Sequence, residues 1–299
     1  MRHLLHWFGA APDKEPAFTE DKHNVSVANS TATAHVHSER VMSLVSELRK
    51  FAPQQTENLL SQMVTALRSD ATETDRYNAA EALSTAVYPK FKFSEFGRLF
   101  LEDQAFLSYY ERFMDAGNWH SLDRKYTLDQ LLKVALTAPG DFVECGVYKG
   151  MTAYLMCQAL QGKDKKVHLF DSFAGLSAPG ELDGSYWVAG ALSAPESVLR
   201  ETLGEFDNYR VYRGWIPERF EEVAGNKFSL VHVDVDLYQP TRDALEFFYP
   251  RTSRGGIILM DDYGFITCPG AKRAADEFFA SKPEPILMLT TGQALVIRQ

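Results

Sequence analysis

Two apolar stretches of this 299-residue chain each run into a pair of carboxylates. In FSLVHVDVDLYQ the apolar run leads to Asp234 and Asp236, and in GGIILMDDYG it leads to Asp261 and Asp262. A buried strand normally avoids acids, because burying an unpaired carboxylate is costly. If the two strands are neighbours, their carboxylates share a small volume and need a cation or raised pKa values. Hard carboxylate oxygens select Mg²⁺ or a similar ion, so the pattern predicts a divalent-cation site.

Turn and capping chemistry is the alternative explanation for these acids. Asp236 fits it in part, because a helix is expected to start near Pro240. Asp261 and Asp262 fit it less well. His232 is expected to be a core histidine with satisfied partners, and no cysteine or histidine is expected to be placed for a soft metal.

The elements that must position these acids alternate between strand and helix. Strand-like runs are expected at 141–147, 166–171, 209–214, 228–234 and 255–261. Helices between them imply a parallel sheet covered on both faces. The chain closes with two strands around a Thr-Thr-Gly-Gln turn, which is too short for a crossover, so this pair is antiparallel. The predicted fold is therefore α/β and Rossmann-like, with a seven-stranded mostly parallel sheet, a C-terminal antiparallel hairpin and an N-terminal helical segment. It resembles class I S-adenosylmethionine (SAM) methyltransferases.

A ligand is expected where the first strands end. The first strand runs into a turn that contains Glu144, Gly146 and Gly150, and the second ends at Asp171. Glycines let the backbone approach a ligand, and an acid after the second strand can hold a ribose diol. The spacing lacks the Gly-x-Gly-x-x-Gly of dinucleotide binders, which disfavours a nicotinamide oxidoreductase and suits a ligand that carries an ammonium and a sulfonium. A tight turn without a ligand is the alternative. Trp215 is expected near an adenine or simply in packing.

Three regions are expected along the chain. Residues 1–38 are polar and without periodicity, which is typical of a flexible tail. Residues 39–120 show helical spacing and are interpreted as a helical N-terminal or cap segment. Residues 121–299 form the predicted SAM-dependent domain.

Two segments are candidates for the wall of an acceptor pocket. One is the long loop 172–193, which carries Tyr186 and Trp187 and has the composition of a lid. The other is the aromatic region 100–126, for which core packing between helices is the alternative. Arg124 is a candidate partner for a cofactor carboxylate.

Composition narrows the classes of function. The formal net charge is −9, which makes the chain a poor candidate for sequence-independent binding to nucleic acid. Its start does not resemble a secretory signal, and no run approaches the length of a membrane span, so a cytoplasmic protein without membrane partners is expected. Three cysteines without a CxxC pair fit a reducing compartment.

Four motifs in order carry a family resemblance: DFVECGVYKG, FDSFAGL, VDVDLYQPTRDALEFFYPR and GGIILMDDYG. They resemble the macrocin-type O-methyltransferase family over roughly residues 120–299. Members of that family methylate sugar hydroxyls of macrolide and aminocoumarin antibiotics. The resemblance implies SAM as cofactor and a divalent ion, usually Mg²⁺, held by Asp234, Asp261 and Asp262. It also implies that Asp234 is the general base. The positions that match or border the SAM site are Glu144, Gly146, Gly150, Asp171, Ser172 and Phe173.

The predicted function is SAM-dependent, divalent-metal-dependent O-methyl transfer to a hydroxyl of a sugar-bearing natural product or a related small molecule. This would be a transferase of natural product biosynthesis. Two alternatives stay open: a methyltransferase of catechol-like phenols, and a non-catalytic SAM-fold binding protein. The acceptor and its hydroxyl position are not defined by the sequence, and a homo-oligomer is compatible with it.

Overall fold

The computed structural model describes residues 42–43, 45–50, 52–88, 92–93, 97–114 and 121–299. The predicted tail, 1–38, lies outside the described residues. By its internal contacts the chain divides into two compact units, Met1–Leu99 and Phe100–Gln299. No helix in the described part of the chain combines the length and the hydropathy that a bilayer crossing requires.

The first unit contains a pair of helices, α2 (Pro53–Ala66) and α3 (Glu73–Val87), which pack against each other. The helix α3 starts at a capping box, in which the Thr72 side chain accepts from the backbone N–H of Asp75 and the Asp75 carboxylate accepts from the N–H of Thr72. The buried Tyr77 ring packs against Phe93, at 5.7 Å between ring centroids. N-terminal helices were predicted and are present.

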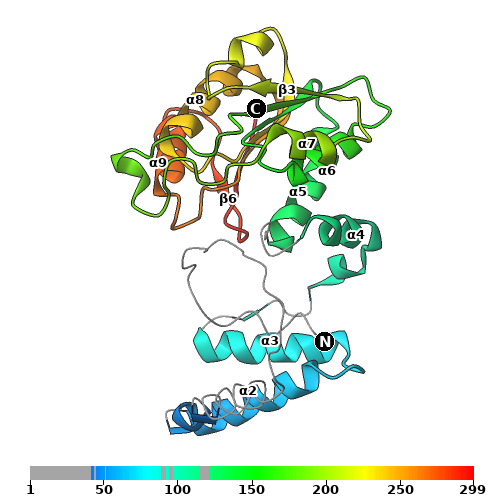
Figure 1. Cartoon of the computed structure of the whole chain (residues 1–299), viewed down its shortest axis with the longest axis vertical. Helices are drawn as coiled ribbons and strands as arrows, with labels where there is room; N and C mark the ends of the chain where they lie inside the picture. The colour runs from blue at the N-terminus through cyan, green and yellow to red at the C-terminus, as the bar shows by residue number, and fades with distance from the viewer. Residues whose placement is uncertain (1–41, 44, 51, 89–91, 94–96, 115–120) are drawn as a thin grey trace, which may run out of the picture. The chain divides into compact units, whose positions relative to one another are not determined.

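The second unit is built on a seven-stranded sheet in the order β3-β2-β1-β4-β5-β7-β6 (Figure 1). Neighbouring strands among β1 to β5 pair in parallel, whereas β7 pairs antiparallel with both β5 and β6. The prediction of a Rossmann-like sheet that ends in an antiparallel hairpin is confirmed. The strands are β1 (Asp141–Cys145), β2 (Val167–Asp171), β3 (Tyr209–Arg213), β4 (Phe228–Val233), β5 (Thr252–Met260), β6 (Leu287–Met288) and β7 (Ala294–Ile297).

Helices cover both faces of this sheet. On one face α5 and α6 pack through Leu128 and Leu155 against alternate strand residues such as Leu230. On the other face α8 and α9 pack against each other and against the remaining residues, with Phe248 and Phe279 in that cluster. Figure 1 shows α8 and α9 on the side of the sheet away from α5 and α6. The helices are α4 (Gln104–Phe113), α5 (Leu122–Ala135), α6 (Met151–Ala159), α7 (Glu196–Thr202), α8 (Tyr238–Phe248) and α9 (Pro269–Phe279), and the 3₁₀ turns are η2 (Leu99–Glu102), η3 (Glu181–Asp183), η4 (Phe220–Val223) and η5 (Tyr249–Arg251).

The closing hairpin is anchored by the buried Glu284 just before β6. Its carboxylate accepts from the Tyr249 hydroxyl at 2.8 Å and from the backbone N–H of Gln299 at 3.3 Å, and it forms an ion pair with Arg298. Burial raises the pKa of Glu284, but these hydrogen bonds outweigh burial and bring it to about 2. The anchor fixes the β6–β7 turn, from which Gln293 reaches Asp261.

Close backbone approach at the end of β1 makes Gly146 irreplaceable. A Cβ at this residue would lie 1.7 Å from the carbonyl oxygen of Asp234, and its φ of +84° is itself unfavourable for other residues. We expect Gly146→Ala to lower the free energy of unfolding by about 3 kcal/mol or more in urea denaturation. Gly162→Ala is the control, since Gly162 has a φ of +72° but no atom within 4 Å of its Cβ position, and should cost about 1 kcal/mol. Equal losses in the two variants would contradict the close approach.

The low pKa of Glu284 predicts an acid-dependent loss of stability. Because the folded pKa lies below the unfolded value, this contribution is present above about pH 4.5 and is lost as the pH falls toward 2. Glu284→Gln should therefore cost about 2 kcal/mol at pH 7 and flatten the fall of unfolding free energy between pH 5 and 2. Glu246→Gln removes an exposed ion pair with Arg242. It should change the free energy of unfolding at pH 7, and its fall between pH 5 and 2, by no more than a few tenths of a kcal/mol. A parallel pH profile in Glu284→Gln and the wild type would refute the assignment.

Candidate active site

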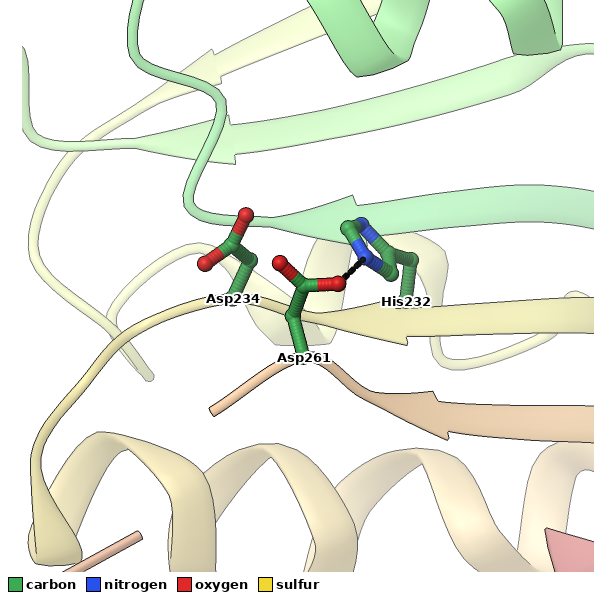
Figure 2. A group of neighbouring side chains, drawn as sticks. All are labelled: His232, Asp234 and Asp261. Atoms are coloured by element: carbon green, nitrogen blue, oxygen red, sulfur yellow. Dashed lines mark hydrogen bonds and ion pairs between the residues drawn. The ribbon is translucent and has the colours of Figure 1, made fainter. Parts of the chain in front are cut away.

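Strand alternation gathers polar groups on the sheet face that α5 covers. Glu144 on β1 and His232 on β4 are register partners. Asp234 comes two residues after His232, and Asp261 two residues after Leu259, so all four polar side chains point to this face. Figure 2 shows the side chains of His232, Asp234 and Asp261 gathered where these strands end.

A chain of hydrogen bonds joins Glu144, His232 and Asp261. His232 is buried, and its Nδ1 lies 3.0 Å from Glu144 Oε1 while its Nε2 lies 3.3 Å from Asp261 Oδ1 (Figure 2). Gln293 also donates to Asp261 Oδ1. The prediction of a buried histidine with satisfied partners is confirmed. A histidine and a cysteine nevertheless lie with the acids: ligand atoms of His232, Asp234 and Asp261 lie within 4.8 Å of one another, and those of Asp236, Asp262 and Cys268 do so too.

Two cations from the first turn of α5 enter the acidic region. Arg124, which the sequence analysis offered as a partner for a cofactor carboxylate, forms an ion pair with Asp261 and lies over the Phe265 ring at 4.6 Å. The ammonium of Lys125 is buried and donates to Thr152 Oγ1 at 3.0 Å. Burial lowers the pKa of Lys125, against the opposing charges of Asp234 and Glu144.

Sequence reasoning did not single out Lys125, although a signal was present. Lys125 precedes Leu128 and Leu132 at spacings of three and seven residues, which places it on the buried face of α5. A lysine on an apolar helix face is costly to bury, and therefore indicates a functional or ion-pairing role.

The remaining acids form a second buried group. Asp262 Oδ2 accepts from the backbone N–H of Asp236 at 2.9 Å, and Cys268 Sγ donates to Asp236 Oδ1 at 3.4 Å. Burial, followed by the charge of Asp234, raises the pKa of Asp236 to about 7. Burial and the charge of Asp236 also raise the pKa of Asp262 well above its usual range.

The three predicted metal ligands are thus divided between two adjoining groups. Asp234 and Asp261 lie with His232, whereas Asp262 lies with Asp236 and Cys268. The two groups adjoin at Asp234, whose charge raises the pKa of both Asp236 and Asp262.

Asp171 holds the loop between β1 and α6 in place. Its Oδ2 accepts from the backbone N–H groups of Val147 at 2.7 Å and Tyr148 at 3.0 Å. Its Oδ1 accepts from the N–H of Phe173 at 2.6 Å. An ionised carboxylate has about four acceptor positions, so Asp171 retains capacity for a ligand hydroxyl. Ser172 donates to the carbonyl of Gly175 at 3.0 Å and starts the long loop.

A cavity of about 440 Å³ opens at the carboxyl ends of β1, β2 and β4. Glu144 Oε2, which is buried, has no hydrogen-bond partner within the described part of the chain. Phe173, Asp261 and Asp262 are not in the cavity lining, although the sequence analysis grouped them with residues that are. The cavity lining includes Lys125, Glu144, Gly146, Lys149, Gly150, Thr152, Asp171, Ser172, Trp215, Asp234 and Asp236.

The loop 172–193 is closed on itself and attached to the core. Leu176 exchanges backbone hydrogen bonds of 2.8 Å with Gly190 and Ala191, and Leu176 and Leu192 line the cavity. Trp187 Nε1 donates to Cys268 Sγ at 3.3 Å, which ties the loop to the second acidic group. The adjacent Tyr186 is exposed and meets the Trp187 ring edge-on.

The aromatic region before α5 belongs to the core. Phe106 and Tyr109 are buried, Tyr109 donates to the carbonyl of Met151 at 2.9 Å, and the Phe106 and Tyr126 rings meet at 5.0 Å. The packing alternative is therefore confirmed for these residues. Trp119 and His120 lie outside the described residues.

Comparison with known families identifies this arrangement. A family model described as Macrocin-O-methyltransferase (TylF) matches residues 124–288, which is more than half of the chain. The chain belongs to this family. The match begins at Arg124 and includes all the acids described above.

The chain is also similar to individual proteins over part of its length. The chain is 36% identical over 160 residues to demethyldecarbamoylnovobiocin O-methyltransferase of Streptomyces niveus, which covers 48% of this chain and 59% of that protein. It is 30% identical over 147 residues to a tetracenomycin-C 4'-O-methyltransferase of Streptomyces olivaceus, 8-demethyl-8-(2,3-dimethoxy-alpha-L-rhamnosyl)-tetracenomycin-C 4'-O-methyltransferase, covering 44% and 56%. The matches therefore span less than two thirds of these relatives.

Solved structures agree with the fold. The O-methyltransferase NovP is 26% identical with a TM-score of 0.51, over 61% of this chain and 83% of that one. The calicheamicin methyltransferase CalS11 is 18% identical with a TM-score of 0.53, over 82% and 93%, and shows the fold alone.

Asp183 in η3 attaches the long loop to the start of α8. It is buried, and it accepts from the backbone N–H groups of Gly180 and Tyr238, at 2.7 Å and 2.6 Å. We expect Asp183→Asn to weaken both bonds and to speed amide exchange at Gly180 and Tyr238 about tenfold, which corresponds to roughly 1.4 kcal/mol. Hydrogen-exchange mass spectrometry measures this directly. Glu181→Gln, in the same turn but exposed, should leave exchange at these amides unchanged. Wild-type exchange rates at Gly180 and Tyr238 in Asp183→Asn would contradict the attachment.

Proposed function

We propose that this protein transfers a methyl group from SAM to a sugar hydroxyl of a glycosylated natural product, with a divalent ion bound among the aspartates. One observation carries the proposal. A cavity with an unpartnered, buried Glu144 oxygen adjoins the buried acids at the ends of β4 and β5. Membership of the macrocin O-methyltransferase family supports the same reaction class.

The methyl donor is assigned to the cavity at the ends of β1 and β2. Glu144 supplies a negative oxygen for the α-ammonium of SAM, and Asp171 supplies acceptors for the ribose hydroxyls. Gly146 lines the cavity without a side chain, because a Cβ there would collide with the backbone of Asp234. Ser172 borders the cavity, and Trp215 lines it after β3, where it offers a surface to adenine.

The side chains around the acids fit a divalent cation. Within the described residues, five carboxylates (those of Glu144, Asp234, Asp236, Asp261 and Asp262) lie with two cationic side chains from α5, Arg124 and Lys125. Burial and the neighbouring acids raise the pKa values of Asp236 and Asp262, and a divalent cation would offset the repulsion between these carboxylates. Hard oxygens of this kind select Mg²⁺.

The proposed ligands are Asp234 and Asp261, which lie with His232, and Asp262, which lies in the adjoining second group. These are the residues that the sequence predicted. His232 is assigned a positioning role, because both of its ring nitrogens already face carboxylates. The bound ion would supply Lewis acidity that lowers the pKa of an acceptor hydroxyl.

Asp234 is the proposed general base. It is the proposed ligand that also lines the cavity, so it is the acid best placed to meet both methyl donor and acceptor. Its carboxylate takes the hydroxyl proton as the acceptor oxygen bonds to the methyl carbon and the carbon–sulfur bond breaks, which leaves S-adenosylhomocysteine. Asp236 is less suited to this role, because its Oδ1 already accepts a hydrogen bond from Cys268 Sγ at 3.4 Å.

A sugar acceptor is supported by two considerations. Two of the relatives are named for the compounds that they methylate, demethyldecarbamoylnovobiocin and a rhamnosyl tetracenomycin. In addition, the loop 172–193 places Tyr186 and Trp187 beside the second acidic group, where an aromatic face suits the apolar side of a sugar ring. A catechol acceptor and a binding protein without turnover are the competing outcomes.

Replacement of Asp261 tests the metal and the reaction separately. Asp261→Asn should weaken Mn²⁺ or Mg²⁺ binding by tenfold or more in calorimetry and reduce turnover by about a hundredfold or more. Because Asp261 is not in the cavity lining, the affinity of the Asp261→Asn variant for SAM should differ from that of the wild type by less than about threefold. The exposed Asp164→Asn variant is the control, and melting curves of both variants check folding.

The wild-type enzyme is first assayed with SAM, with and without EDTA, on a deoxysugar glycoside and on a catechol. Full activity of Asp261→Asn in EDTA would refute the metal assignment. Methylation of the catechol alone would favour the phenol alternative. Stabilisation by NAD and not by SAM would overturn the proposal as a whole.

A further inference from the structure

We propose that Lys125, together with Thr152 in the first turn of α6, binds a carboxylate, so that this end of the cavity recognises a complete α-amino acid group. In the proposed function this group is the methionine end of SAM, and the inference rests on that function. The ligand is thereby required to be a zwitterion, with Glu144 holding its ammonium and Lys125 its carboxylate.

The ammonium of Lys125 is buried, and no counter-ion lies close to it within the described part of the chain. Its residue is 2% exposed, and its Nζ makes one hydrogen bond, to Thr152 Oγ1 at 3.0 Å. An ammonium can donate three hydrogen bonds, and within the described residues Lys125 has no carboxylate oxygen within 4.0 Å. A buried cation of this kind is costly unless an anion approaches it, and Lys125 lines the cavity from which an anion can do so.

The start of α6 adds a second feature that favours an anion. The helix has nine residues, and its N-cap is Gly150, which provides no side-chain cap for the first N–H groups. These groups and the helix dipole give the N-terminus a partial positive charge. Gly150, Met151 and Thr152 all line the cavity, so this end of the helix faces the same space as Lys125.

Glu144 provides the complementary charge next to Lys125. Its Oε2 is buried and unpartnered, while its Oε1 is held by His232. Both residues line the cavity, and they are close enough for the charge of each to act on the pKa of the other. In an α-amino acid the ammonium and the carboxylate are separated by a single carbon, so their binding groups must adjoin in this way.

Arg124 does not compete for this role. It lies one residue earlier on α5, and the helical turn of about 100° per residue sends its side chain to Asp261 instead. Lys149 is the other lysine of the cavity lining, and it extends from the loop over the ring of Tyr148, at 5.2 Å. A different role for Lys125, as a counter-charge to Asp234 alone, predicts no preference for a ligand carboxylate.

The test measures whether the protein distinguishes SAM from its decarboxylated form, which retains the sulfonium and the amine. Binding is followed by calorimetry without divalent ions, so that neither turnover nor the metal affects it. We expect wild-type protein to bind SAM at least about tenfold more tightly than decarboxylated SAM, because the decarboxylated form cannot make the charged hydrogen bonds to Lys125. Lys125→Met should reduce that preference below threefold, chiefly by weakening SAM, and leave the affinity for the decarboxylated form near the wild-type value.

Lys149→Met is the comparison variant and should retain the full preference. Glu144→Gln should instead weaken both amine-bearing ligands and leave binding of 5'-methylthioadenosine, which has no amino acid group, unchanged. Melting temperatures of all variants check folding, and the wild-type preference is informative without any variant.

The outcomes separate the two proposals. If SAM binds but the wild type shows no preference, or if Lys125→Met retains it, the assignment of Lys125 is overturned while the proposed function stands. If Lys149→Met rather than Lys125→Met loses the preference, the carboxylate is bound by the loop and the inference is again overturned. If the wild type binds none of these nucleosides, the proposed function fails and the inference fails with it.

Discussion

Crowding of like charges at one edge of the sheet is the constraint on which this site depends. The strands β1, β4 and β5 are buried on both faces, so their polar end residues cannot be dispersed into solvent. Arg124 and Lys125 from α5 offset part of this charge, and Gln293 from the closing hairpin satisfies one oxygen of Asp261. Raised pKa values at Asp236 and Asp262 absorb a further part. The surroundings of the acids therefore determine which carboxylates remain charged.

The same constraint explains why the helix before the first strand matters as much as the strands. The N-terminal turn of α5 is capped by Ser121, which fixes where the helix starts and hence where its two cations project. The family match also begins within this turn. The cavity wall and the acidic region thus share one helix, although their other residues come from different strands.

Much of the sheet could be predicted from the sequence, because strand–helix alternation and the short final turn are local signals. The positions of the acids after β4 and β5 followed from the same pattern. Their division into two groups did not, although Asp261 and Asp262 are consecutive and alternation sends consecutive side chains to opposite faces. Partners far apart in the chain, such as Arg124 with Asp261 or Trp187 with Cys268, leave no local signal, because each residue is unremarkable within its own segment.

The imidazole between the two halves of the site has a consequence for how they communicate. His232 touches Glu144 with one nitrogen and Asp261 with the other, but a neutral ring carries a single N–H. Only one of the two acids can receive that hydrogen at a time. The tautomer of one imidazole therefore ties the hydrogen bonding of Glu144 to that of Asp261, without any movement of the backbone.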